Sequence, residues 1–306
     1  MKNFDIRDSI FQAVYEHFKK DKNCFFLTAD QGSFGYNILS KKFPSRVINV
    51  GIAEQNMVGI AAGLALEKKT VYIYAISSFL YSRAYEQIKL NLCSMNLKVC
   101  IILSGPGLCY APDGPTHYSL EDIMMLNNLP NLKIFSPYDK KTSNIAINNF
   151  KKGSSPCVIR CDKGEFIEQK VNSLDSAEIL KGKKNVIVSH GFFINYFYQH
   201  QKILKKHDIG LIGINKIKEF NLKKFIKISK NYKNIYYVDE AWLNASFGIH
   251  LSNILISNGI PKNLRILALK NEFLKKGGNR LEILKKNNLD MSSILKIICQ
   301  KKYYVI

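Results

Sequence analysis

Long hydrophobic runs and paired cysteines are missing from this chain of 306 residues. Its apolar runs are strand-sized, such as residues 99–103, and none approaches the ~20 residues that a membrane-spanning helix needs. The seven cysteines include no Cys-x-x-Cys pair, which is unlike a zinc ribbon or a disulfide framework. Residues 1–8 contain acids and no continuous apolar segment, so we expect no secretory signal and a soluble, cytoplasmic protein.

Acidic residues are also scarce: 24 Asp and Glu stand against 45 Lys and Arg, which gives a formal net charge of +21. Such a charge attracts nucleic acid, membrane phosphate or small anionic substrates. The lysines are spread along the whole chain, however, and no nucleic-acid-binding motif accompanies them. We therefore expect a solvated basic surface, with no nucleic-acid and no membrane partner.

Strand-like and helix-like segments alternate along the first half of the chain, which is typical of an α/β fold with a mostly parallel sheet. The expected strands are residues 25–28, 46–50, 70–74, 98–103, 133–135 and 157–160. The expected helices are one from about residue 5 to 18, then 53–67, 78–96, 119–128 and 139–150. Ser119 and Asp122 have the spacing of a capping box at the start of one of these helices.

The pattern lapses in a polar segment at residues 162–184, where we expect a domain boundary. The predicted division is a first domain at 1–165, a linker at 166–183 and a smaller α/β domain at 184–306. Strands of the second domain are expected at residues 185–188, 209–212, 235–238 and 264–267. The fold class is thus α/β, with two domains that each consist of a mostly parallel sheet flanked by helices.

Glu54 lies at a strand-to-helix turn and is followed by an almost wholly apolar helix. If this carboxyl is buried, desolvation disfavours its anion, so it could hold or share a proton with a ligand nitrogen. Alternatively, Glu54 complements the dipole at the helix N-terminus. Gly59 and Gly63 lie four residues apart on one helix face, where missing side chains permit close packing of a neighbour.

These residues resemble a known family. Residues 43–46, leading into residues 49–63, are similar to the pyrimidine-binding domain of transketolase-family thiamine-diphosphate enzymes. Other stretches resemble the same family in the same order, namely residues 27–30, 83–88, 113–117 and 121–122. The second half resembles the C-terminal domain of the family through residues 186–188 and 238–240, followed by Gly248.

The resemblance implies roles for several side chains around the cofactor thiamine diphosphate. Glu54 would hydrogen-bond a ring nitrogen of the aminopyrimidine and so act in catalysis, while the thiazolium of the cofactor serves as electron sink. Phe79 would pack against the pyrimidine, and Asp30 would lie near the thiazolium. Arg83, in the matching stretch 83–88, is a further cofactor-binding candidate.

A second group of residues would bind the sugar substrate. By resemblance, Asp113 would bind a donor hydroxyl, and His117 would bind a substrate oxygen or phosphate and exchange protons near neutral pH. Arg7 and Arg160 match places where relatives that use sugar phosphates keep arginines, whose forked geometry suits phosphate oxygens. The alternatives are a structural role for the histidine and a solvated surface position for both arginines.

Three departures from the family pattern qualify this interpretation. Gly105 stands where many transketolases have a histidine, so the donor is uncertain, and residues 76–78 lack a second aromatic beside Phe79. The chain also has no Gly-Asp-Gly motif, which in this family holds Mg²⁺ and the cofactor diphosphate through oxygen ligands. We therefore predict no metal ligands in this chain and a separate subunit, matching the N-terminal half of transketolase, that carries that motif in an α2β2 assembly.

The predicted activity is transfer of a two-carbon ketol unit from a sugar, or sugar phosphate, to an aldose. Three alternatives stay open: the β subunit of a 2-oxo acid dehydrogenase, a synthase that condenses pyruvate with a sugar phosphate, and a non-catalytic partner of such an enzyme. The Asp113 to His117 loop favours ketose chemistry, the chain length disfavours the synthase, and retention of Glu54 disfavours the non-catalytic partner.

Overall fold

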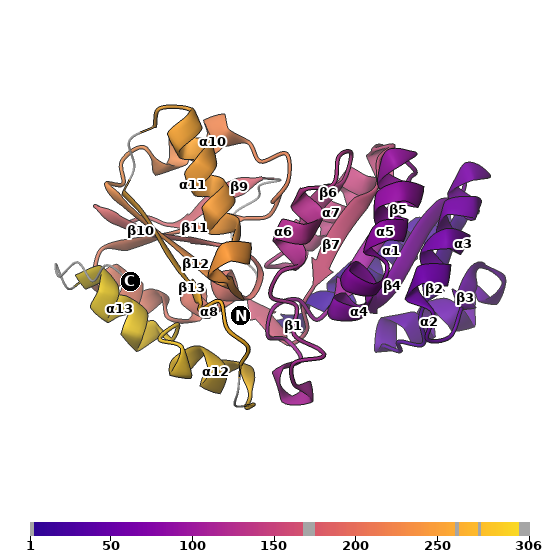
Figure 1. Ribbon diagram of the computed structural model, residues 1–306, viewed down its shortest axis with the longest axis horizontal. Helices are drawn as coiled ribbons and strands as arrows, with labels where there is room; N and C mark the ends of the chain where they lie inside the picture. Colours follow the sequence, from indigo (N-terminus) through magenta and orange to yellow (C-terminus); the bar gives the residue numbers. More distant parts are fainter. Residues whose placement is uncertain (1–2, 168–174, 261–262, 275–276, 300–306) are drawn as a thin grey trace.

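The computed structural model describes residues 3–167, 175–260, 263–274 and 277–299, and it shows two α/β bodies side by side (Figure 1). The first body contains a six-stranded sheet whose strand order is β3-β2-β4-β5-β7-β6. Every neighbouring pair in this sheet is parallel. Its strands are β2 (Cys24–Thr28), β3 (Val47–Asn49), β4 (Thr70–Ile76), β5 (Val99–Ser104), β6 (Lys133–Phe135) and β7 (Cys157–Cys161).

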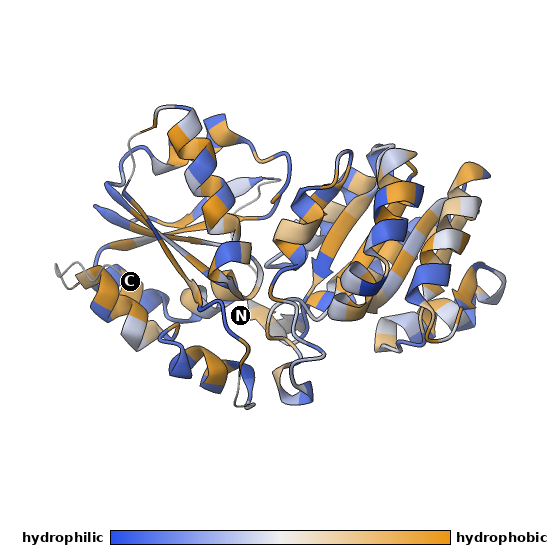
Figure 2. Ribbon diagram, in the orientation of Figure 1, coloured by the Kyte–Doolittle hydropathy of each residue, from blue (hydrophilic) through white to orange (hydrophobic). Residues whose placement is uncertain are grey.

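Helices cover both faces of this sheet, as the predicted α/β class requires. They are α1 (Ile6–Lys20), α2 (Phe34–Lys42), α3 (Glu54–Leu66), α4 (Ser77–Arg83), α5 (Tyr85–Gln87), α6 (Asp122–Asn127) and α7 (Lys140–Lys152), with short helical segments η1 (Pro44–Arg46), η2 (Ile88–Ser94) and η3 (Ala111–Asp113). One apolar cluster joins α1 and α7 to one sheet face, and another joins α3, α4 and α6 to the other. Figure 2 shows the central strands largely in the hydrophobic colour, as expected for strands buried on both faces.

The second body contains a five-stranded sheet in the order β13-β12-β10-β11-β9. All its neighbouring pairs are parallel except β9 with β11. The strands are β9 (Ser176–Leu180), β10 (Asn185–Ser189), β11 (Ile209–Ile214), β12 (Asn234–Trp242) and β13 (Asn263–Leu269). The helical elements are α8 (Gly191–Gln199), α9 (Gln201–Lys206), α10 (Leu222–Ser229), η4 (Leu243–Ala245), α11 (Phe247–Ser257), α12 (Arg280–Lys286) and α13 (Met291–Cys299).

Two strands lie in or at the edge of the segment predicted as a linker. β8 (Glu165–Ile167) pairs antiparallel with β1 (Asn3–Asp5), at the beginning of the chain. β9 pairs with β11, so residues 176–180 belong by pairing to the second sheet. Residues 168–174 of the predicted linker lie outside the described residues. The division into domains at these boundaries stays a prediction.

The expected long helix at residues 78–96 is interrupted. It consists of α4, α5 and the π-helical segment η2. At the first break the carbonyl of Arg83 accepts a hydrogen bond from Gln55 Nε2 at 2.9 Å, so it is engaged outside the helical ladder. The interruption thus coincides with a tertiary contact with α3, which the sequence pattern does not contain.

The predicted capping box of Ser119 and Asp122 is wrong. Helix α6 begins at Asp122 after Glu121, without a side-chain cap. The Ser119 hydroxyl instead contacts Ser77 Oγ at 2.7 Å, and its backbone pairs with Gly107. Ser119 is therefore used to attach the loop after β5 to the start of α4.

No helix within the described residues is both long enough and apolar enough to span a lipid bilayer.

Candidate functional site

Most of the predicted site residues lie just beyond the carboxyl ends of parallel strands of the first sheet. Asp30 follows β2, Glu54 follows β3, Phe79 follows β4, and the loop with Asp113 and His117 follows β5. Because parallel strands end at the same edge, segments far apart in the sequence meet there, and this edge is where open α/β sheets bind ligands. The parallel topology thus explains why separate motifs converge.

Glu54 is the first residue of α3 and is only 5% exposed. Both interpretations of its position therefore apply, since it lies in the first helical turn and its side chain is also buried. Arg83 Nη1 donates hydrogen bonds to the two carboxylate oxygens, at 3.2 Å to Oε1 and 3.4 Å to Oε2. Among the ion pairs of the described residues, Arg83 is the cation paired with Glu54.

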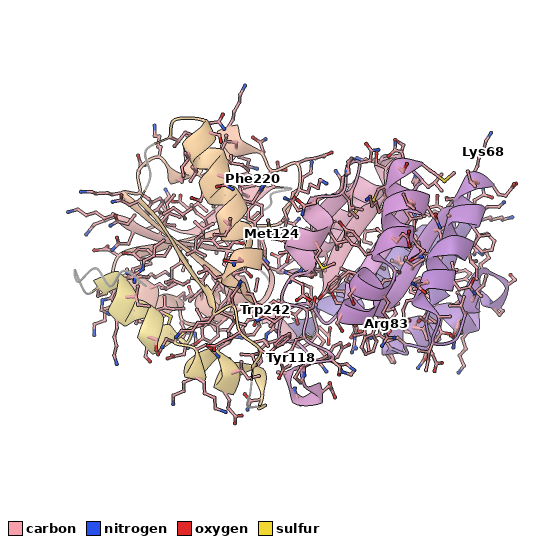
Figure 3. All side chains as sticks on the ribbon, in the orientation of Figure 1. Lys68, Arg83, Tyr118, Met124, Phe220 and Trp242 are labelled. Atoms are coloured by element: carbon pink, nitrogen blue, oxygen red, sulfur yellow. The ribbon has the colours of Figure 1, made fainter. Side chains whose placement is uncertain are left out.

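Arg83 connects Glu54 to an aromatic ring. Its guanidinium carbon lies 4.1 Å from the centroid of the Phe79 ring, which is a cation–π distance. The Arg83 side chain is 49% exposed, whereas that of Glu54 is 6% exposed. The carboxylate therefore belongs to the protein interior, and the arginine covers it from the solvent side. Figure 3 shows Arg83 on the first body, away from the second.

His117 extends a row of contacts that runs from Glu54 through Arg83 to Phe79. Its ring centroid lies 5.0 Å from that of Phe79, in an edge-to-face arrangement. Thr116 Oγ1 lies 3.0 Å from His117 Nδ1, and Ser78 donates a hydrogen bond to the Thr116 carbonyl at 2.9 Å. The loop is thus attached to α4, and the structure brings Glu54, Arg83, Phe79 and His117 together.

Asp30 and Asp113 are exposed carboxylates at the same edge. Asp30 adopts a left-handed backbone conformation with φ 55°, and it exchanges two 3.0 Å hydrogen bonds with the Asn49 side chain. Asn49 Oδ1 also accepts a bond from the Gly51 amide, so this side chain fixes two turns of the site. Asp113 ends η3 and is followed by Gly114, whose φ of +85° suits glycine.

Arg7 lies near the start of α1, where its Nη2 is 3.8 Å from Asp5 Oδ2. Its Nε is buried without a hydrogen-bond partner among the described residues. Burial lowers the pKa of Arg7, but Tyr74, Asp5 and Tyr110 outweigh this effect and raise it above its ordinary value. The Arg7 side chain as a whole is 24% exposed, so its guanidinium is partly open to an anionic or oxygen-rich ligand.

The structure corrects the predicted setting of Arg160. This residue is 7% exposed, and its Nε and Nη2 donate to the two carboxylate oxygens of Asp122 at 2.7 and 3.2 Å. Its Nη1 lies 3.2 Å from Ser136 Oγ and 3.1 Å from His190 Nδ1. A buried carboxylate thus already occupies the guanidinium fork that a phosphate would need, so the arrangement does not support a substrate contact for Arg160.

Sequence reasoning missed Asn49, Gln31 and Tyr110 as site residues. Gln31 Nε2 donates to Ser104 Oγ at 2.9 Å and to the Tyr110 hydroxyl at 3.2 Å. The Tyr110 ring centroid lies 6.2 Å from that of His117. Gly105 is the related feature of the sequence, but only the structure shows that the Tyr110 ring fills the space beside it.

Comparison with known proteins identifies the family of the first body. Residues 2–167 match the family described as transketolase, pyrimidine binding domain. The chain is 28% identical over 304 residues to a subunit of apulose-4-phosphate transketolase from Phocaeicola vulgatus, covering 95% of both chains. It is 33% identical over 264 residues to 1-deoxy-D-xylulose-5-phosphate synthase of Malacoplasma penetrans, covering 84% of this chain but 42% of that protein.

A solved structure described as a split gene transketolase, inactive beta4 tetramer, superposes with a TM-score of 0.83 at 20% identity, covering 98% of this chain and 100% of that chain. Transketolase from Campylobacter jejuni superposes with a TM-score of 0.77 at 15% identity, and this chain covers 47% of it. At these identities the structural likeness shows the fold. The matched family covers more than half of the sequence, and the chain belongs to the transketolase family through its pyrimidine-binding domain.

Proposed function

We propose that this chain is the subunit of a split transketolase that binds the pyrimidine end of thiamine diphosphate. The enzyme would transfer a two-carbon ketol unit from a ketose, in particular a sugar phosphate, to an aldose. The observation that carries the proposal is the buried Glu54 carboxyl at the strand-end edge, with the Phe79 ring and His117 in the same row of contacts.

The residues present fit the pyrimidine half of the cofactor. Glu54 offers a water-shielded carboxyl to a ring nitrogen, and Phe79, which is partly exposed, offers a face for an aromatic ring. Arg83 now covers both groups, but its side chain is half exposed and can move to solvent without breaking the core. When bound, the cofactor would supply the carbon nucleophile and the electron sink. Glu54 would hold the proton shared with the ring nitrogen.

The residues present do not fit the diphosphate half. The group of metal-ligand type found among the described residues is His17, Asp21 and Cys24, at the end of α1 and the start of β2. A nitrogen and a sulfur ligand are poorly suited to Mg²⁺, which prefers oxygen ligands. With no Gly-Asp-Gly motif in the chain, we propose that a partner subunit supplies the Mg²⁺ ligands and the diphosphate site.

The relatives support a two-chain enzyme. This chain covers almost the full length of a protein named as one subunit of a transketolase, but 47% of the Campylobacter transketolase. Helix α3 supports the self-pairing of copies, because open space surrounds the positions where Gly59 and Gly63 would carry a Cβ. Ile52, just before this helix, and Leu66, at its end, are 76% and 55% exposed. We therefore propose an α2β2 assembly built around paired copies of this chain.

His117, Asp113 and Arg7 would bind the sugar. The His117 imidazole is oriented through Nδ1 by Thr116, which leaves its other nitrogen for a substrate oxygen. Arg7 brings a positive charge on a partly exposed guanidinium for phosphate or hydroxyl oxygens. Arg160 is not among the proposed sugar-binding residues, since Asp122 holds its guanidinium.

The test is reconstitution with a partner chain that carries Gly-Asp-Gly, followed by a screen of ketose donors and aldose acceptors with thiamine diphosphate and Mg²⁺. In that assembly we expect Glu54→Gln to lower kcat at least about 100-fold while partner and cofactor binding persist, because general acid–base groups contribute about that much or more. Glu67→Gln, at the exposed end of the same helix, is the matched control. Unchanged turnover in Glu54→Gln would eliminate the proposed proton-holding role.

A further inference from the structure

Tyr110 fills space that a side chain at position 105 would require. A Cβ built on Gly105 would lie 2.0 Å from Tyr110 Cε2 and 2.1 Å from Cδ2, distances that no real contact allows. Gly105 also has φ +76°, in the left-handed region that favours glycine. The aromatic ring therefore occupies the space that any side chain at position 105 would need.

The Tyr110 hydroxyl belongs to a directed hydrogen-bond network. Tyr74 OH lies 3.3 Å from Ser104 Oγ, which lies 2.8 Å from Tyr110 OH. Tyr74 is fully buried, and within the described part of the chain Ser104 is the partner of its hydroxyl. Because buried O–H groups are normally satisfied, we assign Tyr74 as the donor to Ser104 and Ser104 as the donor to Tyr110.

Gln31 completes the network, because its amide donates to both Ser104 and Tyr110. The oxygen of Tyr110 thus accepts from Ser104 and from Gln31, which uses both of its lone pairs. Its own hydrogen remains available for a further acceptor. Burial raises the pKa of Tyr110 above its usual range, so this group is a neutral donor at physiological pH.

The position of this donor is within the proposed site. Gln31 directly follows Asp30, and the Tyr110 ring lies edge-on to His117, next to Phe79. Lys163 Nζ lies 4.4 Å from the Tyr110 ring centroid and covers the ring. Tyr110 therefore stands between the Asp30 turn and the His117 loop.

We propose that Tyr110 is a specificity-determining residue whose hydroxyl donates a hydrogen bond to one oxygen of the ketose donor. This inference rests on the proposed function and deepens it. Unlike an imidazole, a phenol offers a single neutral donor and does not titrate near pH 7. The contact therefore selects a donor with an accepting oxygen at that point, and the selection does not change between about pH 6 and 9.

The experiment is Tyr110→Phe in the reconstituted two-chain enzyme, because phenylalanine keeps the ring against Gly105 and removes only the hydroxyl. We expect kcat/KM for the ketose donor to fall about tenfold, mainly through KM, with KM for the aldose acceptor unchanged. Tyr118→Phe is the matched control. Tyr118 lies in the same loop, and its hydroxyl makes one long 3.4 Å bond to the Ala111 carbonyl. Thermal unfolding of both variants confirms that the fold persists.

A set of mono-deoxy ketoses then tests the contact itself. Wild-type enzyme should lose about tenfold in kcat/KM on the analogue that lacks the contacted oxygen, whereas Tyr110→Phe should use that analogue and the parent ketose equally well. Equal losses for donor and acceptor, or no difference from Tyr118→Phe, would overturn the inference while wild-type turnover still upholds the proposed function. A reconstituted wild type without any ketol transfer would overturn both.

Discussion

Two arginine–carboxylate pairs of the first body differ in burial, and burial determines what each residue can do. Arg83 is half exposed over the buried Glu54, at 3.2 Å, so a ligand can replace it at small cost. Arg160 and Asp122 are both buried and form a forked pair with bonds of 2.7 and 3.2 Å. Buried charges are strongly destabilising when one partner is removed. The first pair is therefore suited to binding and the second to structure.

Arg160→Met should lower the free energy of unfolding by about 3–5 kcal/mol, because Asp122 would be left buried without its cation. Urea denaturation measures this change. Lys183→Met is the control, since it breaks an exposed ion pair with Asp208 of 2.8 Å and should cost about 1 kcal/mol or less. If Arg160→Met unfolds at the same urea concentration as the wild type, the pair with Asp122 does not stabilise the fold, and Arg160 remains a candidate for a substrate contact.

His17 should make the protein acid-sensitive. Burial, helped by Lys151 and Lys98, lowers the pKa of His17 from 6.5 to about 4, and Tyr72 OH lies 2.6 Å from its Nδ1. The unfolded chain therefore binds more protons between these values, and stability falls as the pH drops from 6.5 towards 4. The loss should total about 1–3 kcal/mol. His17→Gln should flatten this part of the stability–pH curve, and exposed His207→Gln should leave it unchanged.

At the scale of secondary-structure elements, α3 is unusual because its apolar character extends to its exposed side. Buried Met57, Val58 and Ala61 face the sheet, whereas Gly59 and Gly63 are exposed with open space around them. A helix that is apolar all round is normally covered on all sides. Since Glu54 begins this helix, a subunit that covers α3 would also help to enclose the proposed cofactor site.

Gly59→Leu is expected to disrupt self-association without disturbing the folded chain. The new side chain meets open space in the isolated subunit, and replacing a helical glycine should raise its stability by about 0.5–1 kcal/mol. Sedimentation velocity should then show smaller species than the wild type forms. Lys202→Leu, at an exposed position of α9, controls for the added hydrophobic surface. An unchanged sedimentation profile for Gly59→Leu would place the contact between copies elsewhere.

At the scale of the whole molecule, the two bodies are held together by buried charge as well as apolar contact. Arg280 of α12 bonds Asp162 at the end of β7, at 2.8 Å, and Glu240 of β12, at 2.6 Å. Its guanidinium lies 3.7 Å from the Phe192 ring centroid. One apolar cluster also contains residues of both sheets, including Ile134 and Ile214. The bodies should therefore unfold together.

Arg280→Met is expected to weaken this junction, because it leaves the carboxylates of Asp162 and Glu240 close together without their shared cation. We expect a loss of about 3–5 kcal/mol in unfolding free energy and a lower Tm. Calorimetry of the wild type should give a single transition. Lys286→Met, in the same helix, removes an exposed lysine as the control and should leave Tm within a few degrees. Two separate wild-type transitions would refute the coupling of the bodies.

The sequence by itself determined most of the secondary-structure elements and the candidate residues of the site. Its hydrophobic periodicity predicted the six strands of the first sheet and the four parallel strands of the second, because this spacing is written directly in the chain, but it missed the antiparallel strand β9. The resemblance of its motifs to the transketolase family made Glu54, Phe79, Arg83 and His117 candidate site residues. Tertiary structure decided which neighbours these residues have. Arg160 meets a buried carboxylate, the helix after β4 breaks where the Gln55 amide bonds the Arg83 carbonyl, and the Tyr110 ring fills the space beside Gly105. Most of these contacts join segments that are far apart in the sequence. They exist only after the sheets have formed, so the sequence pattern does not contain them.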